Sequence, residues 1–241
     1  MKNKNRFLIY TFVILGVLLI HTSSCKKDEN PTPIPTVTDI DGNVYHTVTI
    51  GTQVWMVENL KTTKYRDGSA IPNITDSAAW GNLTTGAYCD YSNTPGNSTT
   101  YGKLYNWYVV NDSRNIAPTG WHVPTDGEWN IMEKYLDNTV DTTATSWVGT
   151  DIGSKVKETG TTHWASPNSG ASNSSGFTAL PGGYRNGNGT FDGIGSNGCF
   201  WSATASNATN AWDRYLGYDY AKVDRGSYPK IDGYSVRCLK D

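Results

Sequence analysis

The clearest structural signal in this chain is the stretch GWHVPTDGEW, which spans residues 120–129. Thr125 can accept a hydrogen bond from the backbone N–H of Glu128, while the Glu128 side chain reaches back to the backbone of Thr125, forming a reciprocal capping box. The apolar residues that follow recur at helical spacing and are Trp129, Met132 and Leu136. The pattern predicts an amphipathic helix that runs from this cap to about Asp137, with its tryptophan and methionine in the core.

Strand signals lie on both sides of this helix. Upstream, residues 44–50 alternate between apolar and polar side chains after an Asp41-Gly42 pair that suits a tight turn, and residues 54–60 resume the strand pattern. Residues 101–110 form a dense aromatic stretch, which predicts a short buried helix. Downstream strand candidates are 199–203, 212–218, 220–224 and 234–239. A hairpin, central helices, long loops and several closing strands together predict an α+β fold.

Five blocks of the chain resemble one known family when they are taken in order. They are VWMVENL at 54–60, YGKLYNWY at 101–108, GWHVPTDGEW at 120–129, FWSA at 200–203 and SVRCLKD at 235–241. Together they resemble the Fibrobacter succinogenes major paralogous domain, which is similar in turn to formylglycine-generating-enzyme and sulfatase-modifying-factor domains. The resemblance implies a C-type-lectin-like domain with long irregular loops, antiparallel strands and one or two helices. It implies a fold more firmly than a function, because most members are surface or secreted proteins without assigned activity.

The amino terminus has the pattern of an export signal. Residues 1–6 carry three positive charges, and residues 7–20 form an apolar run that is too short to span a bilayer as a helix. Small residues then lead to Cys25, which resembles the lipid-attachment cysteine of bacterial lipoproteins, although Thr22 stands where leucine is usual; the alternative is ordinary signal cleavage. Lys26-Lys27-Asp28-Glu29 resembles the signal that sends Bacteroidota lipoproteins to the outer face of the outer membrane, or else is a solvated tether.

We therefore expect three parts in the chain. Residues 1–24 are a lipoprotein signal peptide, residues 25–38 are the lipidated cysteine and a flexible tether, and residues 39–241 are the folded domain. The prolines at 31, 33 and 35 favour an extended spacer in the tether.

Composition and charge exclude several classes of protein. The chain is 37% apolar and 17% charged with a formal net charge of −2, which is unlike a disordered chain. Without residues 1–24, 17 basic and 22 acidic residues give a net charge of −5, and a nucleic-acid-binding protein needs a basic surface instead. The 9 Trp and 15 Tyr, spaced by 25 Gly, are typical of turn-rich extracellular folds and of surfaces that grip ligands.

The residue types that usually carry catalysis or metal ions show no such pattern here. His46, His122 and His163 are far apart and lack metal-ligand spacing, so we expect structural or surface roles for them and predict no metal or cofactor. GIGSNG at 193–198 matches a nucleotide-binding pattern literally, but a strand rather than a helix follows it, which indicates a loop. No GxSxG elbow is present either, and we expect no enzyme.

Three cysteines remain after lipidation of Cys25, and an exported chain can oxidise one pair among Cys89, Cys199 and Cys238. In C-type-lectin-like domains the cysteine of the last strand is commonly bridged toward the first helical region, so the resemblance implies a Cys89–Cys238 bridge. The chain departs from many family members at Ala117, where they carry a cysteine. Copper-dependent formylglycine generation needs two cysteines in one site, and the sequence offers no matching pair.

A ligand surface is expected in the long loops between the helices and the closing strands, where C-type-lectin-like folds carry their ligand contacts. Aromatic faces there can stack on sugar rings or peptide side chains, while polar groups fix hydroxyls or carboxylates. The candidates are Trp147, Trp164, Asn168, Tyr184, Arg185, Asn186 and Asp192. The alternative is that the aromatic members only fill the cores of these loops.

Calcium-dependent sugar binding is a weaker hypothesis. Ser166-Pro167-Asn168 and Trp212-Asp213 resemble the calcium-binding loop and strand of such lectins, but each lacks an acidic partner that a hard cation requires.

The sequence thus favours a surface-anchored lipoprotein that acts as a non-catalytic binding or adhesion module for a glycan or protein ligand. The expected partners are this ligand and outer-membrane lipid, held through acylated Cys25, with the domain facing the cell exterior. Two alternatives remain open: a structural cell-surface component without a specific ligand, and a cryptic enzyme of the formylglycine-generating type.

Overall fold

Helix α4 (Asp126–Leu136) begins at the predicted cap and is the longest helix among residues 34–241, which are those that the computed structural model describes. Thr125 Oγ1 accepts from the Glu128 N–H at 3.2 Å, and Thr125 N–H donates to Glu128 Oε2 at 2.7 Å, so the capping box is confirmed. Trp129 and Met132 are buried, as predicted. The predicted signal peptide, the predicted lipid-attachment residue Cys25 and most of the predicted tether lie outside the described residues.

The first sheet has five strands and joins the start of the described chain to its end. Its order is β1 (Thr36–Thr38), β2 (Val44–Ile50), β3 (Gln53–Met56), β14 (Leu239–Lys240) and β6 (Trp121–His122). The strand predicted at 44–50 and the turn at Asp41-Gly42 are confirmed. Strand β1 pairs with β2, so the fold begins three residues before the expected boundary at Asp39.

Two predicted strands of this sheet are shorter than expected. The segment 54–60 leaves the ladder after Met56, and 234–239 is irregular until β14. These segments still bond to each other, since the N–H groups of Met56 and Leu60 donate to the carbonyls of Cys238 and Val236.

The second sheet has seven strands and is the larger one. Along its main path the order is β7 (Ser146–Val148), β12 (Val223–Arg225), β11 (Asn210–Gly217), β10 (Asn197–Ala205), β8 (Gly182–Arg185) and β9 (Phe191–Ile194), and β13 (Ser227–Pro229) pairs with β11. Strands β7, β8 and β9 lie in segments read as loops from the sequence, because glycine and serine interrupt their alternation. The GIGSNG stretch is the end of β9, a two-residue turn at Gly195-Ser196 and the start of β10, so only its centre is a loop, and no helix follows it.

Short elements occupy the region between the two sheets and along one side. They are α1 (Ser77–Gly81), β4 (Tyr88–Cys89), the 3₁₀ turn η1 (Tyr91–Asn93), α2 (Pro95–Tyr101), β5 (Leu104–Tyr105), α3 (Trp107–Val110) and α5 (Ile152–Val156). The helix predicted over the aromatic stretch 101–110 is therefore only α3, four residues long, with a strand before it. The mixture of mostly antiparallel sheets and few helices confirms the α+β class.

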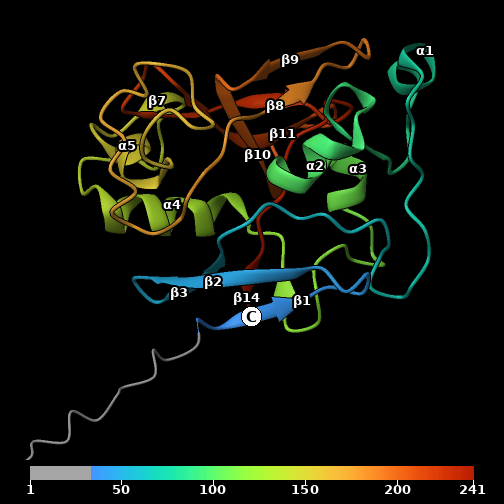
Figure 1. Cartoon of the computed structure of the whole chain (residues 1–241), viewed down its shortest axis with the longest axis horizontal. Helices are drawn as coiled ribbons and strands as arrows, with labels where there is room; N and C mark the ends of the chain where they lie inside the picture. The colour runs from blue at the N-terminus through green and yellow to red at the C-terminus, as the bar shows by residue number, and fades with distance from the viewer. Residues whose placement is uncertain (1–33) are drawn as a thin grey trace, which may run out of the picture. The chain divides into compact units, whose positions relative to one another are not determined.

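Helix α4 is packed between the two sheets (Figure 1). One buried cluster joins Trp129 of α4 to Trp55 of β3 and Phe200 of β10, with ring centroids 4.9 Å and 6.1 Å from Trp129. The five tryptophans of the family-like blocks are all buried, and they are Trp55, Trp107, Trp121, Trp129 and Trp201. Among residues 34–241, no helix combines the length and apolar character that a membrane crossing requires.

A buried charge network fastens α4 to the second sheet. Asp126 accepts from Arg214 Nη1 at 2.8 Å and from Arg225 Nη2 at 2.7 Å, and Glu133 accepts from Arg214 Nε at 2.6 Å. Burial opposes ionisation of Asp126, but the two guanidinium groups hold its pKa below the ordinary value. One helical carboxylate thus fixes the positions of both β11 and β12.

Replacing Asp126 by asparagine is expected to lower the free energy of unfolding by about 3 kcal/mol, because two buried guanidinium groups lose their charged partner. Urea unfolding measures this change. The control is Asp141→Asn, an exposed turn residue whose Oδ1 accepts from Thr143, with an expected change within about 0.5 kcal/mol. Equal losses in the two variants would contradict this role of Asp126.

His122 of β6 ties the end of the chain to the start of α4. Its Nδ1 lies 2.7 Å from Asp241 Oδ1, and its Nε2 lies 2.9 Å from Glu128 Oε1. Partial burial disfavours the imidazolium, but these two carboxylates outweigh it and raise the pKa of His122.

A raised histidine pKa adds stability that is complete below the ordinary value of 6.5 and is lost as pH rises through the folded-state pKa. We therefore expect His122→Gln to flatten the decline in Tm between about pH 5.5 and about pH 8, measured by calorimetry. His46→Gln, at an exposed pair with Glu58, serves as the matched control. An unchanged pH profile for His122→Gln would refute the assignment.

Candidate functional site

Six side chains form one row across the second sheet. The registers pair Trp147 with Asp224, Asp224 with Tyr215 and Tyr215 with Cys199. Strand β8 then places Tyr184 beside β10, because Gly183 is the partner of Gly198, and Tyr184 pairs with Asp192 of β9. Directly opposite residues point to the same side of a sheet, so these six share one face.

The opposite face of the same strands is the one that packs on α4. Val148, Phe200, Leu216 and Val223 alternate with the row and lie in the cluster around Trp129. Arg214 and Arg225 also point to that side, toward Asp126. We call the other side the outer face; its row consists of Trp147, Asp224, Tyr215, Cys199, Tyr184 and Asp192, of which Cys199 is buried in the cluster around Trp201.

Aromatic rings cover both ends of the outer face. Trp147 is stacked on Tyr220, with ring centroids 4.1 Å apart and planes inclined by 19°, and meets Tyr215 edge-on at 5.8 Å. At the other end, Tyr184 and Tyr228 each lie 6.1 Å from Tyr234. Tyr220 is 46% exposed and Tyr228 is 39% exposed, so large ring areas face solvent.

Carboxylates lie among these rings. Asp224 is half-buried in the row, and burial raises its pKa above the ordinary value. Asp213, two residues before Tyr215 on β11 and therefore on the same face, is 1% exposed, and neither of its oxygens has a hydrogen-bond partner. Burial raises the pKa of Asp213 well above its ordinary range. Asp232 nearby is also buried, and burial raises its pKa to about 6.

Glycine at position 226 makes room for Asp213 and the ring beside it. A Cβ at this position would lie 2.6 Å from Asp213 Oδ1 and 2.4 Å from Cε2 of Tyr228, closer than any side chain tolerates. Gly226 also accepts the Asp213 backbone N–H. The Tyr228 ring therefore lies against the backbone next to the buried carboxyl group.

A buried lysine holds the turn that carries Tyr220. Lys157 Nζ donates to the carbonyls of Gly217 at 3.0 Å, Tyr220 at 2.8 Å and Ser169 at 3.3 Å. Burial lowers the pKa of Lys157 to about 8. No sequence motif marks this lysine, because its partners are backbone groups of distant turns.

The seven ligand candidates divide into two groups. Trp147, Tyr184 and Asp192 lie in the row of the outer face. Trp164, Asn168 and Arg185 are buried and donate to carbonyl groups of the chain itself, and Asn186 is half-buried in the β8–β9 turn, where it donates to Thr190 Oγ1. For Trp164 the alternative interpretation, a loop core, is the correct one.

The three buried candidates are occupied by contacts within the chain. Trp164, 1% exposed, donates its indole N–H to the carbonyl of Ala179. Asn168 donates to the carbonyls of Glu158 and Gly160. Arg185 lies between the rings of Trp80 and Phe191 and donates to three carbonyl groups, those of Ile74, Thr75 and Gly189.

The family model for the Fibrobacter succinogenes major domain matches residues 48–240, which is most of the chain. The chain belongs to this family. Both sheets lie almost entirely inside the matched range, and so does every residue of the outer face. No curated protein and no solved structure matches the chain.

Asp213, Tyr215, Tyr220 and Tyr228 of this major domain were missed from the sequence. A usable signal existed, because the predicted strand 212–218 already places Asp213 and Tyr215 on one face. This signal was not sufficient, because strand alternation alone does not show which side chains other elements of the fold will cover.

The Cys89–Cys238 bridge implied by the resemblance is not formed. Cys89, Cys199 and Cys238 are free and buried. Cys89 belongs to a small cluster with Trp80 and Leu104, whereas Cys238 lies in the large cluster around Trp201, so different cores separate the two thiols. Burial raises the pKa of Cys89 to about 12 and also raises those of Cys199 and Cys238.

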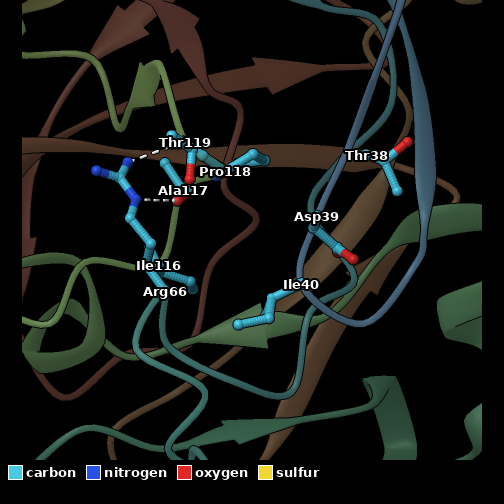
Figure 2. A pocket seen from close by; sticks show the side chains of 8 residues that line it. All are labelled: Thr38, Asp39, Ile40, Arg66, Ile116, Ala117, Pro118 and Thr119. Carbon is cyan, nitrogen blue, oxygen red and sulfur yellow. Dashed lines mark hydrogen bonds between the residues drawn. The ribbon is translucent and has the colours of Figure 1, made fainter.

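One pocket of the domain lies away from the outer face, and its arginine is already bonded within the chain. A pocket of about 220 Å³ lies between Asp39 and Ile40 on one wall and Arg66 with residues 116–119 on the other (Figure 2). The guanidinium of Arg66 donates to the carbonyls of Ala117, Pro118 and Trp121. Among residues 34–241, no group of three or more His, Cys, Asp or Glu side chains is arranged to hold a metal ion.

In a Cys25→Ser variant, we expect the three thiols to react slowly with a thiol reagent in the native domain and completely after denaturation, giving three equivalents. The reason is that buried thiols with raised pKa values carry little thiolate. Spectrophotometric titration measures both phases. A single equivalent in denaturant without reductant would show that one pair is bridged after all.

Proposed function

We propose that this protein is a surface-anchored lipoprotein whose domain binds a ligand non-catalytically through the outer face. The observation that carries the proposal is the row of the outer face, in which partly buried rings and carboxylates lie on both sides of the buried Cys199: Trp147, Asp224 and Tyr215 on one side, Tyr184 and Asp192 on the other. Ligand sites combine aromatic area with a few polar groups of fixed position, and this row has both.

A glycan fits this face best among the two ligand classes that the sequence suggested. Sugars present apolar ring faces together with hydroxyl groups, so they stack on tryptophan and tyrosine while carboxylates accept from the hydroxyls. Trp147 and Tyr220 form a stacked pair whose outer ring is exposed, and Asp224 is the neighbour of Trp147 on the next strand. A row that crosses the whole sheet suits an extended chain of sugars.

The lipid anchor and the location at the outer membrane are part of this proposal. The export signal at 1–24 and the lipid on Cys25 would place the domain at the outer membrane, facing the exterior, with the chain up to residue 35 as the tether. The C-type-lectin-like fold of the proposal rests on the five sequence blocks and fits the α+β arrangement with long loops.

Two alternatives compete with this proposal. A structural surface component without ligand would need none of the exposed rings of the outer face. A formylglycine-generating enzyme would need reactive cysteines, and the raised pKa values of the buried thiols oppose the thiolate form that such chemistry requires.

Replacing Trp147 by alanine is expected to weaken glycan binding by about tenfold or more, because stacked aromatic contacts dominate such sites. A glycan array with the purified full chain identifies ligands, and calorimetry with the strongest one measures the change. The control is Tyr135→Ala, which removes a 66% exposed ring from α4, outside the outer face. Absence of any binding by the wild type, with unchanged adhesion of cells that lack the protein, would leave the structural alternative.

A further inference from the structure

Carboxylates of the outer face have no basic partners. Among residues 34–241, ion pairs within 4 Å form at ten of the twenty acidic residues, and Asp192, Asp213, Asp219, Asp224 and Asp232 are five of the ten that form none. All five lie on strands β9 to β13 or the turns between and just after them, around the exposed rings. Five carboxyl groups without an ion-pair partner therefore lie around the exposed rings.

Basic side chains are present in the domain but are used elsewhere. Lys157, Arg185 and Arg237 are all fully buried, and each donates to backbone carbonyls rather than to a carboxylate. Arg237, for example, donates to the carbonyls of Met56, Phe177 and Thr178. The carboxyl groups of the outer face thus have no basic partner, although three buried basic side chains of the domain have no carboxylate partner.

Asp213 is a second, independent observation that favours a positively charged ligand on this face. It is almost completely buried, both of its oxygens lack a donor, and it lies beside Gly226, which the Tyr228 ring also contacts, on the same face as Asp224. A buried carboxyl group without any donor costs stability, and a partner supplied by a bound ligand is one physical explanation for keeping it. A bound cation favours the ionised form of a carboxyl group and reverses the effect of its burial.

We propose that the ligand of the outer face is a glycan that carries free amino groups, held as ammonium ions by Asp224 with Asp213 beneath and stacked on Trp147 and Tyr220. This inference rests on the proposed function and adds the chemical class of the ligand. Ammonium groups satisfy both features of the face, because they pair with carboxylates and also lie favourably over tyrosine and tryptophan rings. Sugar rings in the same molecule would stack on the flat pair formed by Trp147 and Tyr220.

The test compares two probes of equal length that differ only in charge. One is a hexamer of β-1,4-linked glucosamine with free amines, and the other is the same hexamer with every amine acetylated. Calorimetry with the full chain, at a pH where the amines are charged, is expected to show about tenfold tighter binding of the free-amine probe. Raising the salt concentration to about 0.5 M is expected to remove most of this preference, since exposed ion pairs are screened.

Variants assign the effect to the carboxylates. Asp224→Asn and Asp213→Asn are each expected to weaken binding of the free-amine hexamer by about three- to tenfold and to leave the acetylated hexamer unaffected. The matched control is Asp67→Asn, which removes one exposed carboxylate from a turn in the 61–70 loop and keeps the oxygen that Ser69 uses. The control variant is expected to bind both probes as the wild type does.

Three outcomes would overturn the inference. If the two hexamers bind equally and Trp147→Ala abolishes the binding of both, the outer face does not recognise the amino groups, and the proposed glycan function still holds. Binding of a hexalysine peptide that is as tight as that of the free-amine hexamer and as sensitive to Asp224→Asn would replace the glycan by a basic protein segment. Tighter binding of calcium ion than of the free-amine hexamer, abolished by Asp224→Asn, would assign the carboxylates to a metal.

Discussion

The buried carboxylate of Asp126 is the group on which the rest of the domain depends. It lies in the first turn of α4 and accepts from two arginines on adjacent strands of the second sheet, so it fixes the helix and those strands in one arrangement. Glu133, two turns later, binds the same Arg214. Because these contacts hold one face of β11 and β12 against the helix, alternate side chains of the same strands must point to the other side. The outer face exists because its opposite face is fastened in this way.

Buried lysine and arginine side chains donate to backbone carbonyl groups that, in helices and sheets, would accept from backbone N–H groups. Much of residues 61–100 and 157–181 is irregular, and its carbonyl groups need donors once they are buried. Arg185 donates to the loop at 74–75, Lys157 to the turns at 169, 217 and 220, and Arg237 to residues 177–178. A guanidinium or ammonium group offers several donors from one side chain, which makes it suited to join two or three loops. This use explains how a chain with so many glycines and short strands maintains a defined core.

Sequence reasoning succeeded where a feature is local and failed where it depends on distant partners. The capping box at Thr125 and the alternation of residues 44–50 need only neighbours in the chain, and both were predicted within one residue. Trp164 and Arg185 looked like surface candidates because glycine-rich loops surround them. In the structure Trp164 bonds to a residue 15 positions further along the chain, and Arg185 bonds to a residue 111 positions earlier. Asp213 and Tyr215 were overlooked because a strand pattern alone does not show which side another element will cover.

The sequence by itself determined the family, the α+β class, the helix at 126–136 and the burial of the five tryptophans in the family-like blocks. These features follow from local periodicity, capping and apolar residues, which act through the nearest turns of the chain. Only the tertiary structure decided that Trp147, Tyr184 and Asp192 stand in one row with Tyr215 and Asp224, while Trp164 and Asn168 are buried. The physical reason is that neighbours across a sheet are set by the register between strands that long loops separate, and shifting one strand by one residue would turn every side chain of that strand to the other face.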